Sequence, residues 1–196
     1  MPAEAHPQTR VAGDSPRAPL PADVAAEPEP PGRLSVTLVE EDGDWSGFGA
    51  LDEAIGQAAA ALARHGQVSV APGSEASVVL GSDALVRRLN RTYRGKDKPT
   101  NVLSFPMADD LDFARSNVAG PELLLGDIIL AHGVCAAEAA EKGVSFEQHA
   151  THLLVHGTLH LLGYDHQEDA QASDMEAREV KALARLGIAN PYEVTA

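Results

Sequence analysis

The chain has 196 residues, a single cysteine and a formal net charge of −14 at pH 7. This length allows one domain with a substantial core and is short for two. The one cysteine, Cys135, excludes an internal disulfide framework and a cysteine-rich zinc knuckle. No apolar stretch reaches the length of a signal-peptide core or a membrane span, so we expect a cytoplasmic protein with no membrane partner.

The acidic net charge argues against general affinity for nucleic acids, but the charges are unevenly distributed. From Arg33 onward there are 13 Lys and Arg against 24 Asp and Glu, and six of the 13 lie between Arg87 and Lys98, where Asp97 is the only acid. If the chain binds a phosphate backbone, we expect the segment Arg87–Lys98 to make the contact. A solvated helix face and turn is the equally weighted alternative.

Residues 1–32 are rich in Pro, Ala and acidic residues and show no hydrophobic period. Such a segment buries too little apolar surface to offset its ordering entropy, so we expect a disordered tail. The remaining residues, 33–196, are expected to form a single domain.

Apolar periodicity and turn residues predict the elements of the first half of that domain. In chain order they are a strand at Leu34–Val39, a helix at Phe48–Arg64, short strands at Val68–Val70 and Val78–Leu80, a helix capped by Ser82 or Asp83 and running to Tyr93, and a strand at Val102–Phe105.

The second half begins with an acidic loop at 107–120. It is followed by a central strand at Leu123–Leu130 that contains Asp127, and then by helices at His132–Glu141, at Phe146–Leu162 with Ser145 as N-cap, and at Glu168–Leu186. The whole pattern predicts an α+β fold in which a small mixed four-stranded sheet packs against about five helices.

Five of the eight histidines fall within residues 149–166. His156 and His160 are four residues apart and therefore lie on one helix face, where they can share an ion. Gly163 lets the chain leave the helix and bring His166 back as a third ligand. A single histidine on an apolar helix face is usually a hydrogen-bonded core residue, but three at this spacing are hard to explain that way. His149 and His152 are better explained as supporting, core or surface residues.

Three histidines and an open fourth position are typical of catalytic zinc, so we expect one zinc ion on a helix of the C-terminal half and the turn that follows it. Imidazole also suits nickel, copper and iron. The spacing matches the metzincin protease motif H-E-x-x-H-x-x-G-x-x-H at its histidines and glycine. Gly157 stands where that motif has its catalytic Glu, which disfavours peptide hydrolysis.

Two segments resemble the YbeY family of bacterial endoribonucleases: residues 89–106 (LNRTYRGKDKPTNVLSFP) and residues 156–166 (HGTLHLLGYDH), with Leu125–Ile129 (LGDII) between them also fitting. The resemblance covers about residues 34–193. It implies a single-strand-specific endoribonuclease with one zinc ion on His156, His160 and His166, which matures the 3′ end of small-subunit ribosomal RNA and serves ribosome quality control. The family's functionally required arginine falls on Arg94.

A guanidinium at position 94 makes chemical sense, because it binds phosphoryl oxygens in a bidentate manner as charge develops on them. A salt bridge to a nearby acid is the alternative role of Arg94. Lys96 and Lys98 would then position the RNA backbone. Asp127 would hold the tautomer of a ligand histidine or, as an equal alternative, anchor the 95–101 turn.

Two other functions remain open. The first is a metal-dependent peptidase or amidase that takes its base from elsewhere, with Asp165 and Glu168 nearest in sequence. The second is a non-enzymatic ribosome assembly factor with structural zinc. The expected partners of the endoribonuclease are ribosomal RNA and the small ribosomal subunit, including its basic proteins. No motif indicates an oligomeric state.

Overall fold

The computed structural model describes residues 35–40, 45, 57, 61, 62, 74–107 and 124–193. Four expectations lie wholly or almost wholly outside the described residues: the tail at 1–32, most of the helix at Phe48–Arg64, the strand at Val68–Val70 and the loop at 107–120. Within that helix, Gln57, Ala61 and Leu62 are helical.

A four-stranded mixed sheet forms the centre of the described fold. Its strands are β1 (Ser35–Glu40), β2 (Glu75–Gly81), β3 (Val102–Pro106) and β4 (Leu124–Ala131), in the order β1-β2-β4-β3. β1, β2 and β4 are parallel, and β3 pairs antiparallel with β4 at the edge. The predicted α+β class with a small mixed sheet is confirmed.

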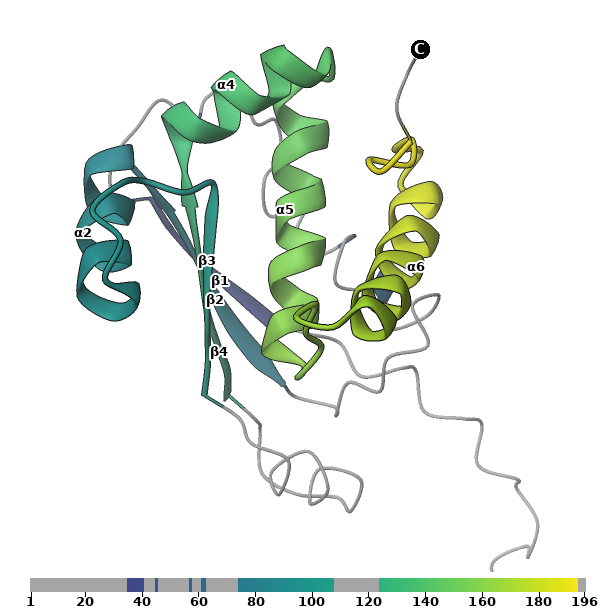
Figure 1. Cartoon of the computed structure of the whole chain (residues 1–196), viewed down its shortest axis with the longest axis horizontal. Coiled ribbons are helices and arrows are strands. Elements are labelled where there is room, and N and C mark those ends of the chain that lie inside the picture. The colour runs from purple at the N-terminus through teal and green to yellow at the C-terminus, as the bar shows by residue number, and fades with distance from the viewer. Residues whose placement is uncertain are drawn as a thin grey trace, which may run out of the picture.

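In the part of the chain that the structure describes, four complete helices cover the two faces of this sheet (Figure 1). They are α2 (Asp83–Arg94), α4 (His132–Lys142), α5 (Phe146–Leu161) and α6 (Asp169–Arg185). α2 packs on one face, and α4 and α5 on the other, with α6 outside α5. No helix among the described residues is long and apolar enough to cross a membrane.

The helix starts follow from capping residues. Ser82 caps α2 by accepting from the Leu85 amide, and Ser145 forms a capping box with Gln148 at the start of α5. α2 ends at Arg94, and its C-cap Gly95 adopts a positive φ of 67°, which glycine accepts because it has no Cβ. The predicted bounds of these helices agree with the observed ones to within one residue.

Strand β4 is apolar on both sides because both faces of the sheet are covered. Ile128 and Leu130 join the core shared with α5, and Ile129 and Ala131 join the core shared with α2. A bulge precedes this alternation, because Glu75 pairs with Leu124 while Ala76 pairs with Gly126. The alternation then places Asp127 on the α2 side, in line with Ile129.

Helix α5 crosses the sheet at a point where only a very small residue fits. A Cβ built on Gly157 would lie 2.9 Å from Cγ2 of Ile128 and 3.0 Å from Oγ of Ser104. Ser104 pairs with Ile128, so the two neighbours lie side by side on the edge strand β3 and the inner strand β4. Gly157 therefore sets how closely α5, and every residue on it, approaches β3 and β4.

We predict that Gly157→Ala destabilises the protein by about 1–3 kcal/mol, because the added methyl group forces α5 away from the sheet. In an uncrowded helix the same change would stabilise by about 1 kcal/mol, so the two cases differ in sign. Urea unfolding followed by circular dichroism measures the difference. A variant more stable than the wild type would show that the sheet leaves room for the methyl group.

Candidate metal centre

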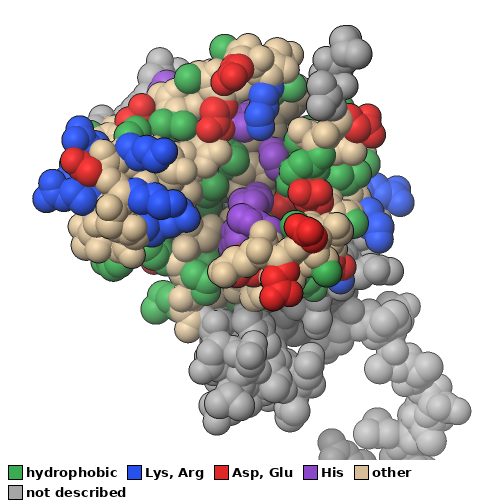
Figure 2. Space-filling view, in the orientation of Figure 1, with side chains coloured by type: hydrophobic (Ala, Val, Ile, Leu, Met, Phe, Trp, Pro, Cys, Tyr) green, Lys and Arg blue, Asp and Glu red, His purple; other side chains and the backbone are tan. Residues whose placement is uncertain are grey.

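Three histidine side chains converge at the C-terminal end of α5. His156 and His160 come from its last two turns, and His166 comes from the segment after the helix. One ligand atom from each of the three lies within 4.8 Å of the others. Figure 2 shows histidines gathered in a hollow of the surface, with Lys and Arg on the α2 side and Asp and Glu on the α6 side. The group can hold a metal ion.

The turn after α5 brings His166 to its partners. The Tyr164 amide donates to the Leu159 carbonyl. Gly163 adopts a φ of 85°, which residues with a Cβ rarely adopt. The Asp165 carboxylate then accepts from the His166 amide at 2.8 Å. As a result, the His166 ring lies 5.3 Å from the His156 ring and 4.9 Å from the His160 ring, measured between centroids.

In His156 and His160, a hydrogen bond on the far side of the ring determines which nitrogen is free. Nδ1 of His160 lies 3.0 Å from the Tyr164 carbonyl oxygen, which can only accept, so this nitrogen carries the proton. Nδ1 of His156 lies 2.8 Å from Oε1 of Glu179 and donates to it in the same way. In the neutral rings, both Nε2 atoms are then unprotonated acceptors.

The two Nε2 atoms face each other at 3.1 Å. Two acceptors at this distance repel unless a proton or a cation lies between them. Nitrogens bound to one zinc ion at ~2.0–2.1 Å in tetrahedral geometry would be about 3.3 Å apart, which is close to the observed separation. The donor set and its tautomers therefore fit a metal ion held by imidazoles.

Glu179 lies directly beneath this cluster and is fully buried. Burial alone would raise the pKa of its carboxyl, but hydrogen bonds from His152, His156 and Tyr192 outweigh burial and lower the pKa to about 2. The carboxylate is consequently charged at neutral pH. It holds the His156 proton on Nδ1 and supplies negative charge beneath a cation-binding group.

Tyr192 ties the segment after α6 to the same carboxylate. Its hydroxyl donates to Oε2 of Glu179, which also accepts from Nε2 of His152 at 3.1 Å. Burial and the neighbouring carboxylate raise the pKa of Tyr192 far above its ordinary value, so the phenol keeps its proton. His152 therefore belongs to the layer beneath the cluster. His149 lies further along α5 and binds Glu138 at 2.8 Å.

Burial also acts on the ligands themselves. The pKa of His160 is lowered first by burial and then by the nearby His156 and His166. A neutral imidazole at neutral pH is the form that binds metal.

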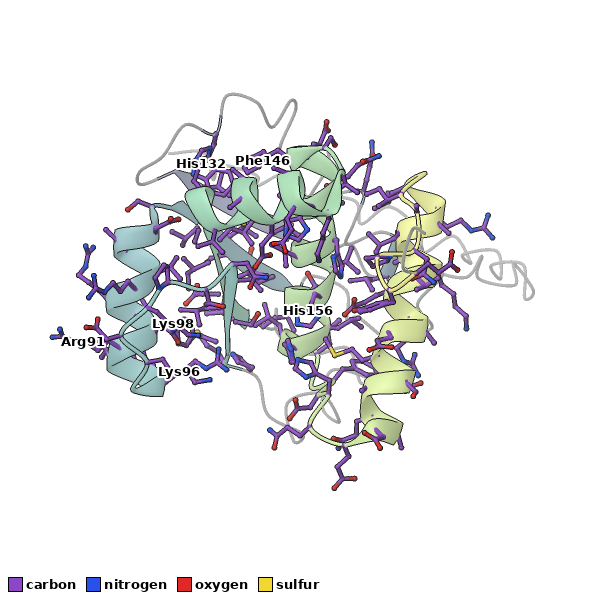
Figure 3. All side chains as sticks on the ribbon, turned by 45° about the horizontal axis from the view of Figure 1, so that its top comes forward. Arg91, Lys96, Lys98, His132, Phe146 and His156 are labelled. Atoms are coloured by element: carbon purple, nitrogen blue, oxygen red, sulfur yellow. The ribbon has the colours of Figure 1, made fainter. Side chains whose placement is uncertain are left out.

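The basic residues predicted to meet phosphate lie at the end of α2 and in the turn that follows. Arg94, Lys96 and Lys98 are all exposed. In Figure 3, Lys96 and Lys98 lie between α2 and His156. The turn is held by two contacts: Asn90 Nδ2 donates to the Lys98 carbonyl at 2.7 Å, and Arg87 forms a bidentate pair with Asp97.

Two roles were considered for Asp127: holding the tautomer of a ligand histidine and anchoring the 95–101 turn. Among the described residues, it makes no hydrogen bond to a ligand histidine or to the 95–101 turn. The cause is the alternation along β4, which turns Asp127 toward α2 while Ile128 faces α5.

The carboxylate that contacts the ligand His156 is Glu179, which the sequence analysis did not single out. A usable signal was present in α6. The buried positions of this helix are Met175, Glu179, Ala182 and Leu183, which are spaced as one apolar stripe. A glutamate inside such a stripe needs a hydrogen-bonding partner, and buried histidines are suitable ones.

We predict that the metal-free protein loses stability as pH falls from 4.5, the ordinary pKa of Glu179, toward about 2, its value in the folded state. A depressed carboxyl pKa stabilises the fold above this window and ceases to do so below it. The contribution is on the order of 3 kcal/mol. His160 adds a loss in the same direction below its ordinary pKa of 6.5.

Urea unfolding at a series of pH values tests this window. Glu179→Gln should be less stable than the wild type at neutral pH and should show a flatter decline in acid. Glu176→Gln removes an exposed carboxylate from the same helix and serves as the control. An unchanged decline in Glu179→Gln would refute the assignment.

Comparison with known proteins gives a consistent result. The family described as Endoribonuclease YbeY matches residues 49–187. The protein of that name from Sphingopyxis alaskensis is 55% identical over 150 residues, which cover 76% of this chain and 88% of the relative. The one from Novosphingobium aromaticivorans is 49% identical over 166 residues, covering 82% and 99%. The one from Rhizorhabdus wittichii is 63% identical over 123 residues, covering 62% and 73%. The chain therefore belongs to the YbeY endoribonuclease family.

Proposed function

We propose that this protein is a single-strand-specific endoribonuclease that uses one zinc ion, matures the 3′ end of small-subunit ribosomal RNA and acts in ribosome quality control. The observation that carries the proposal is the convergence of His156, His160 and His166, with two unprotonated Nε2 atoms 3.1 Å apart, in a hollow with a basic flank. Membership of a family described as endoribonucleases supports RNA as the substrate.

The three histidines would hold the ion, and zinc is preferred because neutral imidazoles and an open position suit it. When bound, zinc polarises phosphoryl oxygens and lowers the pKa of coordinated water. Among the described residues, no fourth His, Cys, Asp or Glu joins the cluster. This open coordination favours a catalytic ion over a structural one.

The chain's own residues supply the remaining parts of the site. Arg94 would stabilise the charge that develops on the non-bridging oxygens of the scissile phosphate, since a guanidinium binds two oxygens at once. Lys96 and Lys98 would hold the flanking backbone without reading bases. Glu179 would keep His156 oriented and its proton on Nδ1.

A peptidase function is disfavoured by position 157. The metzincin glutamate would have to stand where even a Cβ lies 2.9 Å from Ile128. The site therefore lacks the usual base for peptide hydrolysis.

The net charge of −14 bears on the partners. An acidic protein gains little affinity for free RNA from its overall field. Basic proteins of the small ribosomal subunit would attract the same acidic surface and bring the basic turn to the ribosomal RNA. We therefore propose that the subunit, rather than free RNA, is the binding partner.

We predict that the purified protein contains about one zinc ion per chain and cleaves single-stranded RNA. His156→Ala should lose both the zinc and the cleavage, because it removes a ligand. Arg94→Ala should keep the zinc but lose about 10²–10³-fold in cleavage rate. Elemental analysis and gel-based cleavage assays measure the two properties.

Arg185→Ala removes an exposed arginine from the last turn of α6, as Arg94→Ala does from α2, and should cleave normally. Cleavage that survives in both His156→Ala and Arg94→Ala would reject the proposal. Hydrolysis of casein without cleavage of RNA would favour a peptidase. A 2′,3′-cyclic phosphate on the product would show that the RNA's own 2′-hydroxyl attacks.

We also predict that Glu179→Gln weakens zinc binding by about 10–100-fold, because the ligand His156 loses its anionic partner. Glu138→Gln is a matched control, since Glu138 binds His149, a histidine on the same helix outside the cluster. Competition with a chromogenic chelator gives both affinities. Equal zinc affinities in the two variants would show that Glu179 does not support the site.

A further inference from the structure

The outer face of α2 carries an open cavity of about 470 Å³ that the proposed cleavage site does not use. Its lining consists of Ala84, Arg87, Arg88, Arg91, Thr92 and Asp97. In Figure 3, Arg91 lies on the side of α2 away from His156, with Lys96 and Lys98 between them. The volume is in the range of ligand-binding pockets, and the polar lining is mainly arginine.

Only one of the three arginines is neutralised. Arg87 donates through Nε and Nη2 to the two carboxylate oxygens of Asp97, at 2.9 and 3.0 Å. Arg88 and Arg91 are exposed and form no hydrogen bond or ion pair with another described residue. Three arginines against one aspartate leave a net charge of 3 − 1 = +2 in the cavity.

This excess is unexpected in so acidic a chain. From Arg33 onward there are 24 acids for 13 Lys and Arg, so carboxylates are abundant. Neighbouring like charges on a helix cost about 0.2–0.5 kcal/mol per pair. Among the described residues, Arg88 and Arg91 nevertheless form no ion pair with a carboxylate. The C-terminal end of α2 favours the charge of Arg91, but Arg88 lies a turn earlier, and an anionic ligand would stabilise both.

The helix connects this cavity to the proposed cleavage site. Arg87, Arg91 and Arg94 are spaced i, i+4 and i+7 and form one stripe, about 10 Å long at 1.5 Å per residue. A strand held by Lys96 and Lys98 between α2 and the histidines would pass the end of the helix at Arg94 and continue along this stripe to the cavity within two helical turns.

We propose that the cavity formed by Arg87, Arg88 and Arg91 binds the sugar–phosphate backbone of single-stranded RNA, several nucleotides from the cleaved bond. Guanidinium groups suit phosphate because their planar forks match its oxygens. Contacts of this kind to phosphate hold the strand by its backbone and carry no sequence information. This subsite rests on the proposed function, because the RNA reaches it from Arg94.

The test compares two doubly substituted proteins with the wild type. One, Arg88→Gln with Arg91→Gln, removes both unpaired charges of the cavity. The other, Lys181→Gln with Arg185→Gln, removes two exposed charges that lie about one helical turn apart on α6. Fluorescence anisotropy measures binding to labelled single-stranded RNAs of about four and about twenty nucleotides over a range of salt concentrations, with a chelator present to prevent cleavage.

For the long RNA, the cavity variant should reduce the slope of log K against log salt by about 1.4, or 0.7 for each lost phosphate contact. The affinity should fall on the order of 25-fold at about 0.1 M salt. Binding of the short RNA, and its cleavage in a separate assay without chelator, should stay unchanged. The α6 variant should match the wild type on both RNAs.

Three results would overturn the subsite: an unchanged slope, an equal loss on long and short RNA, or a loss of binding to phosphatidylserine vesicles without a loss on RNA. The proposed function fails separately. If the wild type does not cleave but the cavity variant still shows the reduced slope, the subsite stands and the nuclease proposal falls. If the wild type cleaves both RNAs and the cavity variant keeps the wild-type slope, the nuclease proposal stands and the subsite proposal falls.

Discussion

The close contact between α5 and the sheet edge is the constraint on which the site depends. At Gly157 there is no room for a side chain between the helix and the Ser104–Ile128 pair, so the lack of a Cβ is what allows α5 to lie this close to the sheet. Because His156 and His160 flank this contact on the same helix, their direction follows from it. The rigid part of the site is thus set by backbone packing, and the turn through Gly163 only has to add one more imidazole.

A buried carboxylate is the second feature that positions the site. Glu179 accepts hydrogen bonds from two histidines and a tyrosine, which together keep it ionised inside the core. A buried charge of this kind is costly unless it is fully hydrogen-bonded. Here the cost is offset by three donors, and the negative charge lies where it orients His156 and favours a cation. Stability and metal affinity therefore depend on the same side chain.

Local patterns were sufficient for much of the fold. Capping residues such as Ser145 and the apolar run of β4 predicted the elements, and the spacing of the three histidines predicted their convergence. Asp127 failed because its direction depends on strand alternation after a bulge, which the sequence does not reveal. Glu179 was missed because its partners lie 23 and 27 residues away, on another helix. Contacts between helices are decided by packing, which is a non-local property.

The hydrogen bond from Tyr192 to Glu179 has a consequence for biosynthesis. The two histidines that bind Glu179 lie on α5, Glu179 itself lies on α6, and the third donor to its carboxylate follows α6. A growing chain can form the sheet and α5 while its later residues are still inside the ribosome. The carboxylate obtains its full set of donors only after residue 192 has emerged. The layer beneath the histidines is therefore among the last parts of the domain to be assembled, after the scaffold that positions it.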